Sequence, residues 1–474
     1  MNKADGLNWG VRLGFGFGDF AQNLVYPAVS MYLLFFYTEV FKISPAVAAT
    51  MFLVVQLADL LWNPLVGVFM DRHNPLWGKY RSYLVIAGIP LAAFAVLCFG
   101  APLCGFSGAS KVIYAFATYA GFTMLFTVVN VAYGALGSSL SRDVDEITIL
   151  TAVRIFMANA GCMVVSMGVP LLVYAMAGGR EPPWRMAFFM GLNILPSFVL
   201  MPLVPNMRRR LGRRGMFFIS ALVAGVGMAA LYVLSRIGRI EDHIGVVYAA
   251  QSVKASGIIV ATGCMWALVP EVITYSEHLT GRRVSGIVNA ITGVSFRVGM
   301  AIGKIVPGLV LAWTGYRVSS VDSGSNIPAD PHAWLWTMAI FSFAAAVFLV
   351  VSFSHTKERI VMEGTATTQV KMCDIWHEFR RNVPLRIMVL FFTVAFAMMS
   401  VGNAAGAYFM NGMEGQSALA QEGIRWLVCV IPAILLVAAA VAVMRYPLDD
   451  DSVDRLAHDI ESKRKTFPSC TSSN

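Results

Sequence analysis

The sequence predicts an all-α, polytopic membrane protein with twelve transmembrane helices. Of its 474 residues, 57% are hydrophobic and only 13% are charged, and the mean hydropathy is +0.66. A soluble globular protein carries about 25% charged residues, because its surface faces water. This composition excludes a soluble enzyme, and we expect no catalytic residues in the chain.

Twelve apolar segments are each long enough to cross a bilayer, which takes about 20 residues in a helix. Their continuous hydrophobic runs differ from the alternating pattern of a membrane β-barrel. In order, the segments occupy residues 12–39, 46–70, 82–104, 111–137, 148–177, 185–205, 215–235, 244–274, 285–314, 333–354, 384–410 and 424–444.

Basic residues gather in alternate loops between these segments. The densest group is Arg208–Arg214, which holds five arginines, and others lie in residues 71–81, 278–283 and 357–381. Because cytoplasmic loops carry an excess of Lys and Arg, we expect both termini on the cytoplasmic side of the cell (inner) membrane. The net charge of +9 therefore indicates orientation in a membrane rather than nucleic-acid binding.

Nothing in the sequence indicates a metal or nucleotide cofactor. The seven cysteines show no CxxC or CxxxH spacing. Gly14, Gly16 and Gly18 alternate inside the first apolar segment, whereas a nucleotide-binding glycine loop follows a strand. We expect these glycines to let a neighbouring helix approach closely. Without a Walker motif, transport driven directly by ATP is also excluded.

A few polar residues lie inside the apolar segments, where an ionisable group is costly and is a functional candidate by default. Asp59 and Asn63 are one helical turn apart and share one face. Their oxygen atoms could bind a small cation, or the carboxylate could carry a proton. The alternative is a structural ion pair between Asp59 and a cation such as Arg297. The ionisable residues inside the apolar segments, together with one amide (Asn130) in the middle of the fourth segment, are Asp19, Asp59, Asn130, Arg154, Lys254, Glu271, Arg297 and Lys304.

Four stretches carry a family resemblance. They are GFGFGDFAQN at 14–23, DLLWNPLVGVFMDRHNPLWGKYR at 59–81, PEVITYSEHLTGRRVSG at 270–286 and RYPLDDDSVDRLAHDIESKRK at 445–465. The chain resembles the glycoside–pentoside–hexuronide:cation symporters, which are the melibiose permease relatives within the major facilitator superfamily. The resemblance implies two six-helix bundles that face each other across a central sugar site and move by alternating access.

The resemblance also implies a set of site residues. It assigns cation coupling to Asp59 and Asn63, and it places Arg297 at the family's eleventh-helix lysine. Substrate binding falls on polar residues of the first, fourth and fifth segments together with that arginine: Asn23, Asp19, Asn130, Arg154 and Arg297.

Several positions depart from melibiose permease. Asn23, Asn63 and Asn130 each stand where that protein has an acid, Gly134 stands where it has an aromatic residue, and Thr274 replaces a second acid. These departures argue against melibiose as the substrate and against sodium as the coupling ion.

The order of the segments also departs from the family pattern. Residues 333–354 and 384–410 look like the family's sixth and seventh helices, yet they follow the helix that resembles the eleventh. Both moved blocks hold an even number of helices, so no helix is inverted. The alternatives are a chance likeness between apolar helices and an artificial rearrangement.

With this order, the chain divides into six parts. They are helices one to five of the first bundle at 1–177, helices of the second bundle that resemble the family's eighth to eleventh at 178–316, the sixth-like helix at 333–354, a cytoplasmic loop at 355–383, the seventh- and twelfth-like helices at 384–444, and a cytoplasmic tail at 445–474.

The leading functional interpretation is secondary active transport of a sugar or glycoside with a cation, with a proton favoured over sodium. One alternative is transport of an anionic sugar, such as a hexuronide, held by Arg154 or Arg297. Two others are a non-transporting membrane sensor and a lipid carrier on the same fold. The expected partners are a small sugar, the coupling cation and the lipid bilayer, and we expect a monomer.

Overall fold

The computed structural model describes residues 7–73, 75, 77–100, 108–140, 144–177, 184–237, 243–280, 285–316, 330–356, 379–380, 382–411 and 416–445. Across these ranges all regular structure is helical, which confirms the all-α prediction. The expected loop at 355–383 and tail at 445–474 lie almost wholly outside the described residues.

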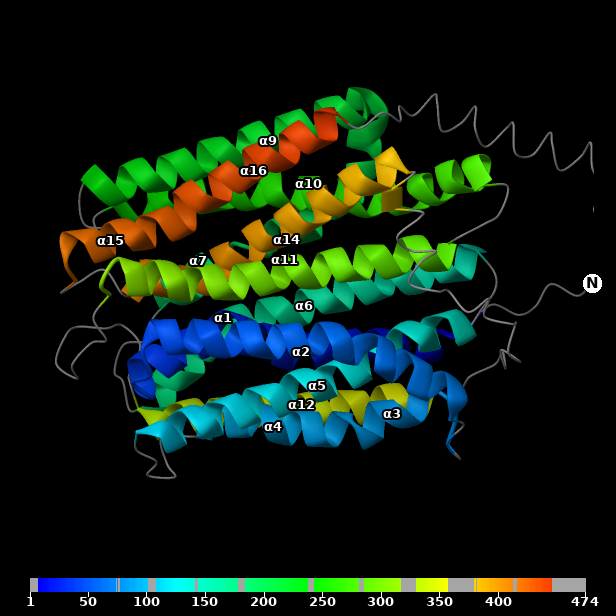
Figure 1. The fold of residues 1–474 in the computed structure, drawn as a ribbon, viewed down its shortest axis with the longest axis horizontal. Coiled ribbons are helices and arrows are strands. Elements are labelled where there is room, and N and C mark those ends of the chain that lie inside the picture. The colour runs from blue at the N-terminus through cyan, green and yellow to red at the C-terminus, as the bar shows by residue number, and fades with distance from the viewer. Residues whose placement is uncertain are drawn as a thin grey trace, which may run out of the picture.

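The helices form two bundles that lie side by side (Figure 1). The first bundle contains α1 (Trp9–Phe35) with its π-helical extension η1 (Phe36–Val40), α2 (Pro45–Arg72), α3 (Arg81–Ile86) with α4 (Gly88–Gly100), α5 (Ala109–Leu140), α6 (Val144–Met176) and α12 (Pro331–His355). The second contains α9 (Val204–Ile237), α10 (Ile244–Thr280), α11 (Ser285–Trp313), α14 (Val383–Asn411) and the run α15 (Ala418–Arg425), η5 (Trp426–Val430) and α16 (Ile431–Met444).

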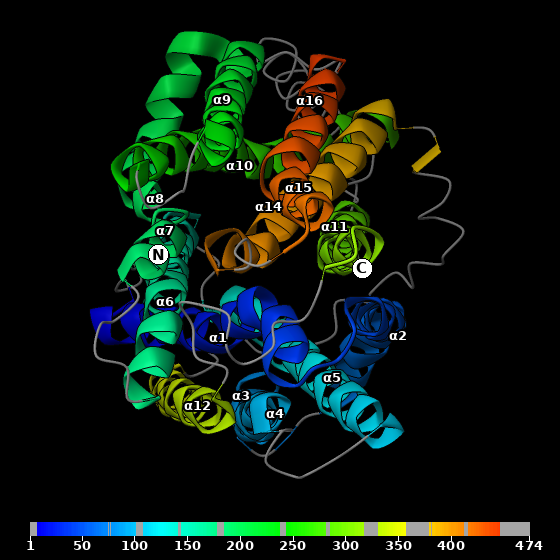
Figure 2. The same cartoon turned by 90° about the vertical axis from the view of Figure 1, so that its left-hand side faces the viewer.

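A short helical segment lies at the seam between the bundles. It consists of α7 (Trp184–Gly191), α8 (Leu195–Leu200) and η3 (Met201–Leu203). α7 packs against α6 on one side and against α10 and α14 on the other, as the end view in Figure 2 shows.

α12 lies in the first bundle, although it follows α9, α10 and α11 of the second in the chain. It packs against α1, α4 and α6. The Phe348 ring stacks on Phe17 of α1 at 5.1 Å between centroids, and Trp334 stacks on Phe99 of α4 at 5.9 Å. α14 packs against α11 and α16 instead. The chain therefore passes between the bundles three times: after α6, after α11 and after α12.

Eleven described helical segments are long and apolar enough to cross a membrane. The twelfth expected span is α1, whose 27 residues are long enough to cross a membrane. Its Asp19, Gln22 and Asn23 lower its hydropathy, and most of α1 is buried among α6, α12 and α14 rather than facing outward. Large apolar side chains elsewhere are exposed, including Leu61 at 72% and Phe343 at 73%. Such a surface suits lipid, because soluble monomers rarely expose large apolar patches.

The local sequence explains where several helices begin. Pro45 and Pro331 occupy the first turns of α2 and α12, where a missing N–H costs nothing. The Ser44 hydroxyl accepts a hydrogen bond from the Val47 N–H, and the Asp330 carboxylate accepts one from the His332 N–H. These caps satisfy donors that a helix leaves unpaired at its start.

Gly212 divides α9 into two parts. Its φ of 66° lies in the left-handed region, which glycine adopts without a steric penalty. The break separates the arginine-rich turns from the apolar span at Gly215–Ile237. On the arginine-rich side, Arg208 forms an ion pair of 2.6 Å with Glu271 of α10.

The bundles are joined at the end where α1 finishes and α2 begins. Thr38 and Tyr408 of α14 share a hydrogen bond of 2.7 Å between their hydroxyl groups. Gly308 of α11 lies so close to α2 that a Cβ built on it would be 2.8 Å from the Ala49 Cβ. This closed end consists of Thr38, Ala49, Gly308 and Tyr408.

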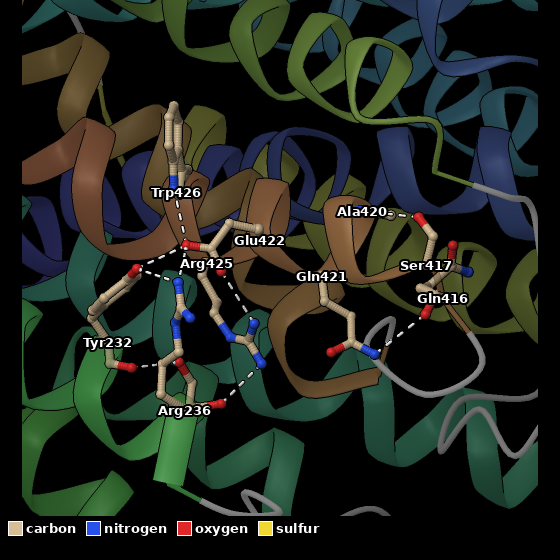
Figure 3. Close-up of polar contacts among 10 residues, drawn as sticks. Tyr232, Arg236, Gln416, Ser417, Ala420, Gln421, Glu422, Arg425 and Trp426 are labelled. Atoms are coloured by element: carbon tan, nitrogen blue, oxygen red, sulfur yellow. Dashed lines mark hydrogen bonds and ion pairs between the residues drawn. The ribbon is translucent and has the colours of Figure 1, made fainter.

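At the end of α9, the carboxylate of Glu422 joins α9 to α15. It accepts hydrogen bonds from the Tyr232 hydroxyl and the Arg236 guanidinium, both at 2.8 Å, and from the Arg425 guanidinium at 3.2 Å (Figure 3). Arg425 also donates to the Ser235 carbonyl oxygen at 3.0 Å. These contacts fix the start of the helix that continues into η5.

Candidate functional site

A cavity of about 270 Å³ lies between the bundles. Residues of α1 and α6 form one wall, and residues of α8, α10, α14 and η5 form the other. Most of the lining is methionine and aliphatic side chains. The polar lining residues are Asn23, Asn159, Asn193, Ser197, Lys254, Thr262 and Asn403.

Asp59 is the centre of an ion pair between the bundles. It is 6% exposed on α2, where its carboxylate accepts a hydrogen bond from the Thr127 hydroxyl of α5 at 2.5 Å. The Arg297 guanidinium of α11 pairs with the same carboxylate. Asn63 lies one turn further along α2, and with its amide oxygen turned toward Arg297 it accepts from Nη1 at 3.0 Å and from Nε at 3.1 Å.

A second ion pair lies within the first bundle. Asp19 of α1 is 7% exposed, and its carboxylate pairs with the Arg154 guanidinium of α6. Arg154 also lies over the Tyr133 ring at 5.1 Å from its centroid, which adds a cation–π contact. The Tyr133 hydroxyl donates to the Phe15 carbonyl oxygen at 2.6 Å, so the ring is held in place.

The Asp19–Arg154 pair stands one helical turn from the cavity. Asn23 follows Asp19 by one turn on α1, and its amide donates to the Asp19 carbonyl oxygen at 2.9 Å. Ala158 follows Arg154 by one turn on α6, and both Asn23 and Ala158 line the cavity. The pair therefore lies beside the cavity, one turn along α1 and α6 from residues that line it.

A buried lysine, Lys304 of α11, forms a third polar group beside α2. Its ammonium donates to the Tyr119 hydroxyl at 3.2 Å and lies over the Tyr26 ring at 5.0 Å. The Gln56 amide donates to the same Tyr119 hydroxyl at 3.1 Å. Lys304 is therefore held by aromatic and hydroxyl groups rather than by a carboxylate.

Comparison with known proteins identifies the family. The family model for MFS/sugar transport proteins matches residues 14–190, 182–328 and 320–421. The chain belongs to this family.

Curated bacterial transporters are similar over most of their length. The chain is 32% identical to the uncharacterized symporter YnaJ of Bacillus subtilis, with 72% of this chain and 89% of that protein covered. It is 26% identical to the isoprimeverose transporter of Lactiplantibacillus pentosus (75% and 91% covered) and 26% identical to a glucuronide carrier protein homolog of Escherichia coli (67% and 86% covered). This sugar transport family member is a multi-pass membrane transporter and not an enzyme.

The structure of this family member brings together some of the sequence-predicted residues and separates others. Asp59, Asn63 and Arg297 form one cluster, and Asp19, Asn23 and Arg154 form another. Arg297 thus pairs with Asp59, which is the structural partner that the sequence analysis offered.

Asn130 belongs to neither cluster by direct contact. It is half-buried on α5, one turn beyond Thr127. It does not line the cavity, and its side chain makes no hydrogen bond to another residue in the described part of the chain. A role in substrate binding stays a prediction.

Three of the amide residues that line the cavity escaped the sequence analysis of this transporter. They are Asn159, Asn193 and Asn403, from α6, the turn between α7 and α8, and α14. The search was for ionisable groups, and a carboxamide carries no charge. The usable signal was an amide inside an otherwise apolar span, the signal that drew attention to Asn130.

Proposed function

We propose that the chain is a secondary active transporter that carries a sugar or glycoside together with a proton by alternating access. The observation that carries this proposal is the Asp59–Arg297 ion pair, which links the two bundles. A cavity with several carboxamides in its lining lies between the same bundles. A group that changes charge at a link between the bundles can make their movement depend on a cation.

The cavity suits a polyhydroxylated substrate. Each carboxamide offers an acceptor oxygen and two N–H donors, which match the mixed donor and acceptor character of sugar hydroxyls. Asn23, Asn159 and Asn403 come from three helices and surround one space. The volume of about 270 Å³ is near the lower end for ligand pockets, which favours a substrate of one or two rings. Two relatives named above for isoprimeverose and glucuronide support this class of substrate.

A proton suits Asp59 better than a sodium ion. A hard cation gathers several oxygen ligands, but here a guanidinium, which only donates hydrogen bonds and keeps its charge, already lies against the carboxylate. A second cation at this point would be repelled by Arg297. Protonation of Asp59 instead removes its charge, releases Arg297 and loosens the link between α2 and α11.

The basic turns before Gly212 set the orientation. Arg208–Arg210 lie beyond the apolar span of α9, and the positive-inside rule places them in the cytoplasm. Both termini are then cytoplasmic and the closed end of Thr38, Ala49, Gly308 and Tyr408 faces outward. We place the protein in the inner membrane as a monomer, because two bundles already enclose the cavity.

The test is uptake by the purified protein in liposomes, with a panel of neutral and acidic glycosides. An imposed proton gradient, inside alkaline, should drive accumulation of a panel member, while a sodium gradient at equal pH should not. Accumulation driven by sodium alone would contradict proton coupling. Failure to exchange any sugar under either condition would contradict sugar transport itself.

A further inference from the structure

We propose that Lys254 is an anion-binding residue of the cavity, so that the transported sugar carries a carboxylate or sulfonate group. This inference rests on the proposed sugar transport and specifies its substrate class. Lys254 lies on α10, is 4% exposed and lines the cavity. Neither the family resemblance nor any relative assigns a role to this residue.

Lys254 differs from the other cations near the centre of the molecule. Arg154 and Arg297 are each neutralised by an aspartate, and Lys304 is held by the Tyr119 hydroxyl and the Tyr26 ring. No carboxylate lies within ion-pair distance of Lys254 among the residues that the structure describes. No hydrogen bond from its ammonium to a described residue is found either.

The acids that might have neutralised Lys254 already have partners. Asp19 and Asp59 hold Arg154 and Arg297, Glu271 holds Arg208, and Glu422 holds Arg236 and Arg425. An ammonium buried without a counter-charge is costly. The cavity that it lines is the place from which a counter-charge can come.

The wall beside Lys254 defines the rest of the ligand. Asn193 accepts a hydrogen bond of 2.7 Å from Gln251, which lies one turn before Lys254 on α10. Asn403 on the same wall and Asn23 and Asn159 on the opposite wall offer further amide groups. An anionic group on Lys254 and hydroxyls on the amides describe an acidic monosaccharide or small acidic glycoside. The sequence analysis had assigned an anionic sugar to Arg154 or Arg297, and their aspartate partners leave Lys254 as the better candidate.

The test compares matched ligands that differ only at one carbon. Counterflow exchange in liposomes, which needs no gradient, is measured for methyl hexosides, for the corresponding hexuronides and for the corresponding C6 sulfonates. The unsubstituted protein should exchange one or both acidic series and prefer them to the neutral series. Lys254→Gln should weaken the acidic ligands about 10- to 100-fold, as expected for loss of a charged hydrogen bond, and should weaken them more than the neutral ligands that share the cavity. Lys254→Arg should keep the acidic preference.

The outcomes separate this inference from the proposed function. Exchange of neutral hexosides alone overturns the role of Lys254 and leaves sugar transport standing. Absence of exchange with every ligand overturns both. An equal loss for acidic and neutral ligands in Lys254→Gln identifies Lys254 as a structural residue and overturns its role in binding.

A stability measurement tests the same inference without a substrate. Because Lys254 has no partner in the empty cavity, Lys254→Met should raise the melting temperature of the ligand-free protein in detergent. Lys304→Met is the matched control, since Lys304 is equally buried at 6% but has partners, and it should lower the melting temperature. A lower melting temperature for Lys254→Met would mean that Lys254 already has a stabilising partner, and would overturn the proposal.

Discussion

Asp19–Arg154 joins two helices of one bundle, whereas Asp59–Arg297 joins α2 of the first bundle to α11 of the second. The chemistry is the same: a buried aspartate held by an arginine. In the proposed alternating access the bundles move against each other, so the first pair would move as a unit and could stay intact. The second pair would have to stretch or break. Position between bundles, rather than burial, therefore separates a pair that lies beside the cavity from one that can control movement.

The largest expected effect comes from locking the bundles together. Cysteines at Ala49 and Gly308 should form a disulfide across the bundles after a small displacement, because their Cβ atoms would be 2.8 Å apart and a disulfide needs about 3.5–4.5 Å. Oxidation should abolish both uptake and exchange, and reduction should restore them.

The matched control is a disulfide within one bundle, between Gly14 of α1 and His355 of α12. A Cβ on Gly14 meets the His355 Cβ even more closely. In a background free of the native cysteines this pair should cross-link and leave exchange within about twofold of the reduced protein, since both helices move together. Failure of this pair to cross-link would place α12 outside the first bundle.

The next largest effect separates the two aspartates. Asp59→Asn should abolish accumulation against a gradient while leaving counterflow exchange measurable, because the variant can no longer gain and lose a proton. Asp19→Asn should instead weaken both activities together, since it leaves Arg154 unpaired one turn from the cavity. Uptake and exchange are measured in the same liposomes. Accumulation by Asp59→Asn would remove Asp59 from the coupling mechanism.

Replacing the arginine of the pair between bundles should have a graded effect. Arg297→Ala leaves Asp59 without its cation and should lower the transport rate by about 100-fold. Arg297→Lys keeps the charge but loses the planar fork, and its loss should stay within about tenfold. The initial uptake rates of the two variants in liposomes measure this difference. Near-normal rates for both variants would mean that the pair does not take part in transport.

The smallest effect is expected at the exposed end of the second bundle. Arg236 is more than half exposed where it meets Glu422, and exposed ion pairs contribute little. Arg236→Gln should leave uptake within about twofold of the parent, because Tyr232 and Arg425 still hold the same carboxylate. A large loss of transport would show that this end of α9 has a role beyond holding α15.

The helices were predictable from sequence because each span repeats one strong signal, a long apolar run. α1 is the instructive exception: Asp19, Gln22 and Asn23 reduce its hydropathy, and its place at the centre of the molecule makes that tolerable. The charge of Asp19 inside an apolar segment first marked α1 as a candidate site helix, and the family resemblance added Asn23.

The site was predictable only in part, because contacts between distant helices decide it. The sequence offered both a coupling role and a structural ion pair for Asp59, and it offered Arg297 as one partner among several cations. Thr127 could not be foreseen, since an isolated hydroxyl in an apolar span carries no distinguishing pattern. Lys254 was visible as a charge, but only the packing around it reveals that no described acid meets it.

The helix order stays a prediction. It expects the helix at 333–354 to pack with the first five spans, and α12 packs against α1, α4 and α6.

The three crossings of the chain between the bundles have a consequence for synthesis. During translation α1 to α6 enter the membrane first, but the groove between α1, α4 and α6 is filled only by α12. The ribosome must therefore produce residues 331–355, after the whole of α7 to α11, before the first bundle is complete. Until then that groove exposes helix faces such as Phe17 and Phe99 that are covered in the finished protein. A chain cut after α6 would leave neither fragment with a complete bundle, so the two halves cannot be separated into autonomous units at that point.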